Sequence, residues 1–161
     1  MAKKRVYFET AAVSCLTADK PTLDIVQLAR RQLTRQWWEH RDRWELFVSP
    51  AVLDEITEGH SGAAAKRVGA VRGLPVLADH PEARALAKKL EIEAPIPVKS
   101  QADAAHLAFA AFYEMDYLVT WNQTHLDNPH IRGKVNAILR GKGLSPAAVV
   151  TPEVLMEIKD D

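Results

Sequence analysis

The stretch Val6-Tyr7-Phe8-Glu9-Thr10 decides the fold, because three strand-forming residues run directly into side chains that carry oxygen. β-branched and aromatic residues favour a strand, and the apolar residues 11–16 that follow can turn into a helix. A strand that passes straight into a helix is the opening unit of an alternating α/β chain.

The same order of elements recurs along the whole sequence. Further strands are predicted at about 46–48, 74–77, 117–120 and 149–150, and helices at about 21–43, 49–59, 63–71, 82–90, 100–115 and 131–139, with a turn or short helix over 122–126. This alternation predicts a three-layer α/β/α sandwich around a mainly parallel sheet of four or five strands. A length of 161 residues fits one domain spanning 1–161.

Composition excludes several classes of protein. The 21 basic and 21 acidic residues cancel, so affinity for nucleic acid would have to come from local patches or from a metal. The single cysteine rules out an internal disulfide framework and a cysteine zinc site. With no apolar run of membrane-spanning length, we expect a cytoplasmic protein that does not enter a membrane.

Four side chains with oxygen atoms stand where strands end or just inside the next helix: Glu9, Glu55, Asp103 and Asn122. In an open parallel sheet, ligands bind outside the carboxyl ends of the strands, so these side chains are expected to share one catalytic site. Carboxylates about 4 Å apart repel by roughly 4 kcal/mol at an effective dielectric near 20. The grouping therefore implies a protonated acid or a cation such as Mg²⁺ or Mn²⁺, held by the three acids.

Each of the four also has a plainer interpretation. Glu9 can be a surface residue at the end of a strand, and Asn122 can be a turn residue bonded to its own backbone. Asp103 can be a first-turn acid that completes a helix cap. Glu55 competes with its neighbour Asp54, but Glu55 borders the apolar face of its helix and is preferred.

At these residues the chain resembles the PIN-domain nucleases, in particular their VapC-like toxin branch. The resemblance implies a compact α/β/α sandwich, a Mg²⁺- or Mn²⁺-dependent site of clustered acids, and cleavage of RNA. For toxin members it also implies a cognate antitoxin and a homodimer. The matching pieces are Val6-Tyr7-Phe8-Glu9-Thr10, Val48-Ser49-Pro50-Ala51-Val52-Leu53-Asp54-Glu55, Ala102-Asp103-Ala104-Ala105-His106-Leu107-Ala108 and Asp116-Tyr117-Leu118-Val119-Thr120-Trp121-Asn122.

Two positions depart from that family. Glu9 stands where the wider family usually has Asp, and a longer carboxylate can adjust by binding a cation directly or through water. Asn122 stands where an acid is common, and its amide offers an oxygen without charge. One metal ion is therefore favoured over two.

Other polar and aromatic residues have two interpretations each. Thr10, Thr120, His125 and Asn128 are candidates to contact the site acids or the substrate, or else to cap helices and loops. His106 lies one helical turn after Asp103, and a packing role is favoured over metal binding. The tryptophans Trp37, Trp38 and Trp44 and the nearby arginines Arg30, Arg31, Arg35, Arg41 and Arg43 offer stacking and phosphate contacts, but core packing and a solvated helix face are preferred.

The leading hypothesis is a metal-dependent endoribonuclease that acts as the toxin of a toxin–antitoxin pair. The alternative is a PIN-like module that has lost its chemistry and binds RNA or a protein. A domain that binds a small phosphate-bearing molecule is disfavoured, because no glycine-rich loop follows the first strand.

Overall fold

A four-stranded parallel sheet forms the centre of the structure, a computed structural model that describes residues 2–94, 96 and 101–159. The strands are β1 (Arg5–Phe8), β2 (Glu45–Phe47), β3 (Tyr117–Val119) and β4 (Ala148–Val150), in the order β2-β1-β3-β4. In the register of the central strand, Val6 lies opposite Leu46 of β2 and Tyr117 of β3. The carboxyl ends of all four strands therefore face the same edge.

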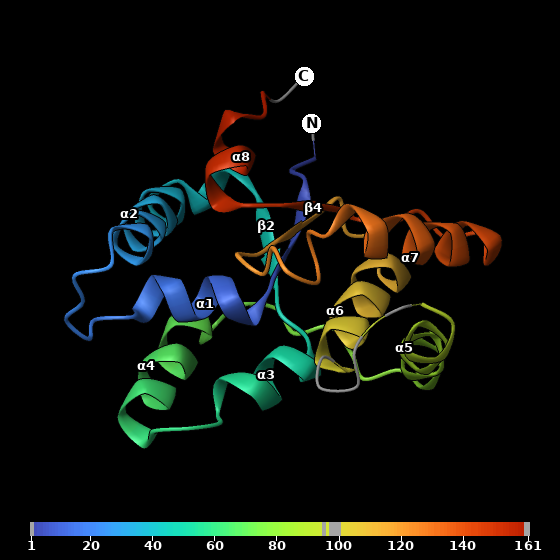
Figure 1. Ribbon diagram of the computed structural model, residues 1–161, viewed down its shortest axis with the longest axis horizontal. Coiled ribbons are helices and arrows are strands. Elements are labelled where there is room, and N and C mark those ends of the chain that lie inside the picture. The colour runs from blue at the N-terminus through green and yellow to red at the C-terminus, as the bar shows by residue number, and fades with distance from the viewer. Residues whose placement is uncertain (1, 95, 97–100, 160–161) are drawn as a thin grey trace.

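Helices cover both faces of this sheet (Figure 1), as the sequence predicts for a three-layer sandwich. Helix α1 packs against α2 and α4, and α2 packs against α8, whereas α5 packs against α6 and α7 on the other side. None of the described helices is both long and apolar enough to cross a lipid bilayer. The helices are α1 (Thr10–Thr17), α2 (Ile25–Glu39), α3 (Pro50–Ile56), α4 (Ser61–Val71), α5 (Pro81–Glu93), α6 (Gln101–Phe112), α7 (Pro129–Gly141) and α8 (Pro152–Glu157), with a short 3-10 helix η1 (Arg41–Arg43).

Helix starts follow local capping rules. Four helices begin with a side chain that accepts a backbone N–H and is followed by proline, which suits the first helical position because its missing N–H would have had no partner there. Predicted cap Ser100 of α6 lies outside the described residues. The four pairs are Ser49-Pro50, His80-Pro81, Asn128-Pro129 and Thr151-Pro152.

Several predicted elements are shorter than expected, among them the helices predicted over 49–59 and 100–115, which end at Ile56 and Phe112. The strand over 74–77 is reduced to a single bridge between Val48 and Val76, because Pro75 has no N–H and only its carbonyl joins Val48. The helix over 21–43 begins at Ile25, where Asp24 caps it, and ends at Glu39. The segment 122–126 is a turn, closed by a hydrogen bond from Asp127 N to Asn122 O.

The aromatic residues near the end of α2 build the core rather than a surface for bases. Trp37 is fully buried, with its ring 5.2 Å from Phe8 and 5.9 Å from Trp44. Partly buried Trp38 stacks on the same Phe8 ring at 5.5 Å. This aromatic cluster packs α2 against β1, the strand that directly precedes Glu9.

Two of the three arginines of α2 bind the local backbone, whereas the third, Arg30, donates to the side chain of Gln123. Arg31 donates to the carbonyl oxygen of Lys20, and Arg35 donates to those of Leu16 and Ala18. These contacts satisfy carbonyls at and after the end of α1, which have no partner within that helix. The two side chains thus hold the link between α1 and α2.

Candidate active site

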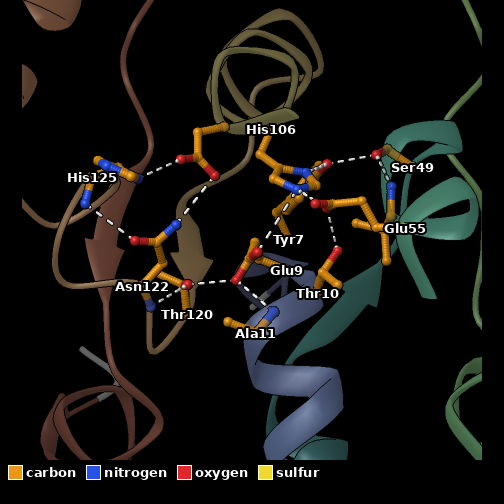
Figure 2. Close-up of polar contacts among 12 residues, drawn as sticks. Tyr7, Glu9, Thr10, Ala11, Ser49, Glu55, His106, Thr120, Asn122 and His125 are labelled. Carbon is orange, nitrogen blue, oxygen red and sulfur yellow. Dashed lines mark hydrogen bonds and ion pairs between the residues drawn. The ribbon is translucent and has the colours of Figure 1, made fainter. Parts of the chain in front are cut away.

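The carboxyl edge of the sheet brings together side chains that are far apart in sequence (Figure 2). Glu9 directly follows β1 and Thr120 directly follows β3, and Glu9 N donates to Val119 O at 3.2 Å. Glu55 reaches the same place from the last turn of α3, and His106 reaches it from α6. The convergence predicted from the strand ends is therefore present for Glu9 and Glu55.

Glu9 lies at the buried centre of the site, with only 3% of its surface exposed. Its Oε2 accepts from Ala11 N at 2.9 Å, which caps α1, and from the Thr120 hydroxyl at 2.5 Å. Burial raises the pKa of Glu9, although His106 and the Thr120 and Ala11 donors partly oppose that rise. A nearby positive charge would favour the ionised form of this carboxylate.

Glu55 is the more accessible carboxylate, with 30% of its side chain exposed. Its Oε1 accepts from the Thr10 hydroxyl at 2.6 Å and lies 2.6 Å from His106 Nε2. Burial alone would raise the pKa of Glu55, but the bonds from His106 and Thr10 outweigh it and lower that pKa. Neighbouring Asp54 is exposed, so the residue that enters the site is Glu55, as its place beside the apolar face of the helix predicts.

His106 belongs to this cluster, which is a larger role than the packing role favoured from the sequence. The ring is fully buried, and Nε2 lies 3.7 Å from Glu9 Oε1 as well as close to Glu55. Its Nδ1 lies 2.7 Å from Tyr7 Oη. Burial works against a charged ring, but the hydrogen bond to Glu55 and the charge of Glu9 raise the pKa of His106.

One donor atom from each of Glu9, Glu55 and His106 lies within 4.8 Å of the other two. Within the described residues, no second group of three such side chains has this spacing. Two carboxylates, one of them held in a site that disfavours its uncompensated charge, are the oxygen donors that Mg²⁺ and Mn²⁺ prefer. The residues present therefore fit a hard divalent cation.

Asp103 lies beside this group and not in it, unlike the trio expected from the sequence. The side chain of Asp103 is 11% exposed. Its Oδ1 accepts from Asn122 Nδ2 at 3.1 Å, while Oδ2 lies 3.1 Å from His125 Nδ1. Burial raises the pKa of Asp103, and His106 and His125 oppose that rise. The site thus has two adjoining halves, one centred on Glu9 and the other on Asp103.

The remaining predicted residues divide between the site and its surroundings. Thr10 contacts Glu55 rather than its sequence neighbour Glu9, whereas Thr120 holds Glu9 and also accepts from Asn122 N at 2.9 Å. Asn128 caps α7, and its side chain donates to Thr124 O. Among the residues that the structure describes, its side chain bonds to no carboxylate of the site.

Two residues of the site are not among those predicted from the sequence. Tyr7 looked like an ordinary strand residue and Ser49 like an ordinary helix cap, yet Tyr7 Oη lies 2.5 Å from Ser49 Oγ and links it to His106. The available signal was the hydroxyl of Tyr7 in an apolar strand, because a buried tyrosine hydroxyl needs a hydrogen-bond partner.

Comparison with protein-family models and with curated proteins gives no match. Among solved structures, the chain is similar to VapC20 of Mycobacterium tuberculosis, described as a toxin that cleaves the sarcin–ricin loop. The TM-score is 0.57 at 16% sequence identity, and the match covers 74% of this chain and 91% of VapC20. This likeness confirms the predicted fold: the chain shares the PIN-like α/β/α architecture of that toxin.

Proposed function

We propose that the protein is a metal-dependent endoribonuclease that hydrolyses phosphodiester bonds of RNA. The observation that carries the proposal is the meeting of Glu9, Glu55 and His106 at one edge of the sheet, with Glu9 almost completely buried and the carboxylate of Asp103 beside them. Clustered carboxylates at that edge are suited to hold a cation that acts on a phosphate. The shared fold with an RNA-cleaving toxin supports RNA as the substrate.

Glu9 and Glu55 are the residues proposed to hold Mg²⁺ or Mn²⁺, with Asp103 completing the negative surface beside them. A bound cation of this kind polarises a phosphoryl oxygen and lowers the pKa of a water. Thr120 and Thr10 each donate to one of the two glutamates, which fixes the carboxylates in place before substrate binds.

The second half of the site is proposed to receive the RNA backbone. Asn122 and His125 both engage Asp103 and so set its orientation. The side chain of His125 keeps 23% of its surface exposed, which places it at the border between the buried carboxylates and solvent. Asn122 and His125 are therefore proposed to position Asp103 and the scissile phosphate.

The direct test is cleavage of purified RNA with Mg²⁺, with Mn²⁺ and with a chelator. Wild-type protein is expected to cut with either ion. Glu9→Gln and Asp103→Asn are expected to lose about 100-fold or more in rate, because changing even a group that only orients a metal ligand costs about 10–100-fold. Asp54→Asn is the matched control, because it removes an exposed carboxylate next to Glu55 and is expected to leave the rate unchanged.

Equal cleavage by wild type and Glu9→Gln would reject catalysis at this site. A wild-type protein that binds RNA but neither binds Mn²⁺ in calorimetry nor cleaves would instead establish the alternative of a binding module. The two results are distinguishable in one set of preparations.

A toxin role, with a cognate antitoxin and a homodimeric state, is proposed from the fold shared with VapC20. Expression in a bacterial host is expected to arrest growth, and Glu9→Gln is expected to relieve the arrest. Light scattering of the purified protein measures the number of subunits. If wild-type protein cleaves RNA in vitro but its expression leaves growth unaffected, the toxin role is rejected and the ribonuclease proposal stands.

A further inference from the structure

A continuous chain of hydrogen bonds runs through the buried side of the site (Figure 2). It begins at Val52 N, which lies 3.3 Å from Ser49 Oγ, and continues from Ser49 to Tyr7 Oη at 2.5 Å. From Tyr7 it reaches His106 Nδ1 at 2.7 Å, and from His106 Nε2 it reaches Glu55 at 2.6 Å. Four segments of the fold, β1, the start and end of α3, and α6, are joined by it.

The direction of the donors in this chain depends on where the Ser49 hydroxyl places its proton. A backbone N–H only donates, so Val52 donates to Ser49 Oγ. If the Ser49 hydroxyl donates to Tyr7, the Tyr7 hydroxyl can donate to His106 Nδ1, and Nε2–H can donate to Glu55. Every proton then has one acceptor.

The opposite direction leaves a proton without a partner. If Nδ1–H donated to Tyr7 and Tyr7 donated to Ser49, the Ser49 hydroxyl would find no further acceptor within the part of the chain that the structure describes. Ser49 is fully buried, so bulk water does not reach it. A buried donor without an acceptor is unfavourable.

We propose that His106 keeps its proton on Nε2 and acts as a positioning residue that holds Glu55 beside Glu9, and that it is not a ligand of the cation. A metal-binding Nε2 would have to give up that proton and place it on Nδ1, which imposes the unfavourable direction. The proposal rests on the proposed function for the cation itself. It assigns the cation to oxygen ligands and gives Tyr7 and Ser49 the task of fixing the imidazole tautomer.

The wild-type protein gives the first test, without any substitution. In a nitrogen-15 spectrum of the histidine rings, recorded as a pH series that extends above the raised pKa of His106, the neutral ring of His106 is expected to have Nε2 protonated and Nδ1 unprotonated. Diamagnetic Mg²⁺ is expected to leave this pattern unchanged. Loss of the Nε2 proton on addition of Mg²⁺ would overturn the proposal.

Two other histidines provide internal references for that spectrum. Nδ1 of His80 accepts from Glu82 N at 3.0 Å, and Nδ1 of His60 accepts from Gly62 N at 3.2 Å. Both rings therefore carry the neutral-state proton on Nε2, as proposed for His106. The spectrum of His106→Gln identifies the resonances of His106 by their disappearance.

The second test compares two ions by calorimetry. His106→Ala is expected to weaken Mg²⁺ and Mn²⁺ binding by the same factor, about 10-fold or more, as found for groups that orient metal ligands. His106→Gln is expected to restore most of the affinity, because its amide can still donate to Glu55. His40→Gln is the matched control, because His40 is exposed and lies directly after the end of α2.

A much larger loss for Mn²⁺ than for Mg²⁺ in His106→Ala would overturn the proposal, because a nitrogen ligand favours the transition metal. Failure of this idea and of the proposed function are distinguishable. A wild-type protein that binds neither ion rejects the proposed function. One that binds Mg²⁺ through an unprotonated Nε2 keeps the proposed function and rejects the positioning role.

Discussion

The side-chain amide of Asn122 donates to Asp103, with Nδ2 3.1 Å from Oδ1, and its own oxygen accepts from His125 N at 3.1 Å. A carboxylate only accepts hydrogen bonds, so the amide turns its nitrogen toward Asp103 and its oxygen toward the turn. The oxygen that the sequence suggested as a neutral metal ligand is therefore already bonded. Asn122 holds Asp103 in place and adds no second negative charge.

Asn122→Asp is expected to destabilise the metal-free protein. The change replaces a donor by a like charge beside Asp103, whose pKa is already raised by burial. We expect a loss on the order of 1 kcal/mol, which lowers Tm by roughly 2–4 °C for a chain of this size. Because the added charge also attracts a cation, Mg²⁺ should raise the Tm of the variant more than that of wild type.

Asn128→Asp is the matched control for that prediction. Asn128 caps α7 through its side-chain oxygen, and Asp caps helices about as well as Asn. We expect its unfolding free energy to stay within about 0.5 kcal/mol of wild type. Thermal unfolding in chelator and in Mg²⁺ gives the Tm of both variants. Equal changes of Tm in Asn122→Asp and Asn128→Asp would show that the contact with Asp103 is not the cause of the destabilisation.

Glu9→Gln is expected to stabilise the metal-free protein at neutral pH. Burial raises the folded pKa above its ordinary value of 4.5, so the folded state binds more protons between the two values and stability falls as pH rises through that window. Glutamine keeps an oxygen to accept from Ala11 and Thr120 but carries no charge. At pH values above the raised pKa of Glu9, the Tm of Glu9→Gln in chelator should exceed that of wild type. A lower Tm would show that burying the charge of Glu9 does not destabilise the fold.

Glu55→Gln is expected to have the opposite effect on stability. The lowered folded pKa of Glu55 means that its ionised form stabilises the fold above the ordinary value of 4.5, and that this stability is lost as pH falls through the lowered value. Weakening its charged hydrogen bonds should cost on the order of 1 kcal/mol at neutral pH. A pH series of unfolding in chelator compares the two glutamine variants, and changes of the same sign would contradict the assignment.

Local rules explain why much of this architecture was predictable. The run from Val48 to Glu55 contains a strand end, a serine cap and a proline at the first helical position, and each of these acts within a few residues. Parallel pairing then places the residues that follow β1 and β2 at one edge, whatever the details of packing. Glu9 and Glu55 were therefore correctly expected to approach each other.

The interior of the site depends on contacts that no local pattern records. Tyr7, Ser49 and His106 meet because α6 packs across β1 and the start of α3, and the sequence does not specify how far α6 is rotated. The same rotation turns Asp103 toward Asn122 and His106 toward the glutamates. For this reason the sequence located the acids but assigned their nearest partners incompletely.

Thr120→Val is expected to affect both stability and metal binding. The buried hydroxyl donates to Glu9 and accepts from Asn122 N, so its removal should cost about 1–3 kcal/mol and weaken Mg²⁺ binding about 10-fold or more. Thr10→Val removes one hydrogen bond to Glu55 and should cost under about 1 kcal/mol, because Glu55 is partly exposed and water can replace the lost donor. Chemical unfolding measures the loss of stability in each variant, and calorimetry measures the loss of Mg²⁺ affinity. Larger losses in Thr10→Val than in Thr120→Val would contradict the prediction, because they would make the threonine bond to Glu55 more important than the one to buried Glu9.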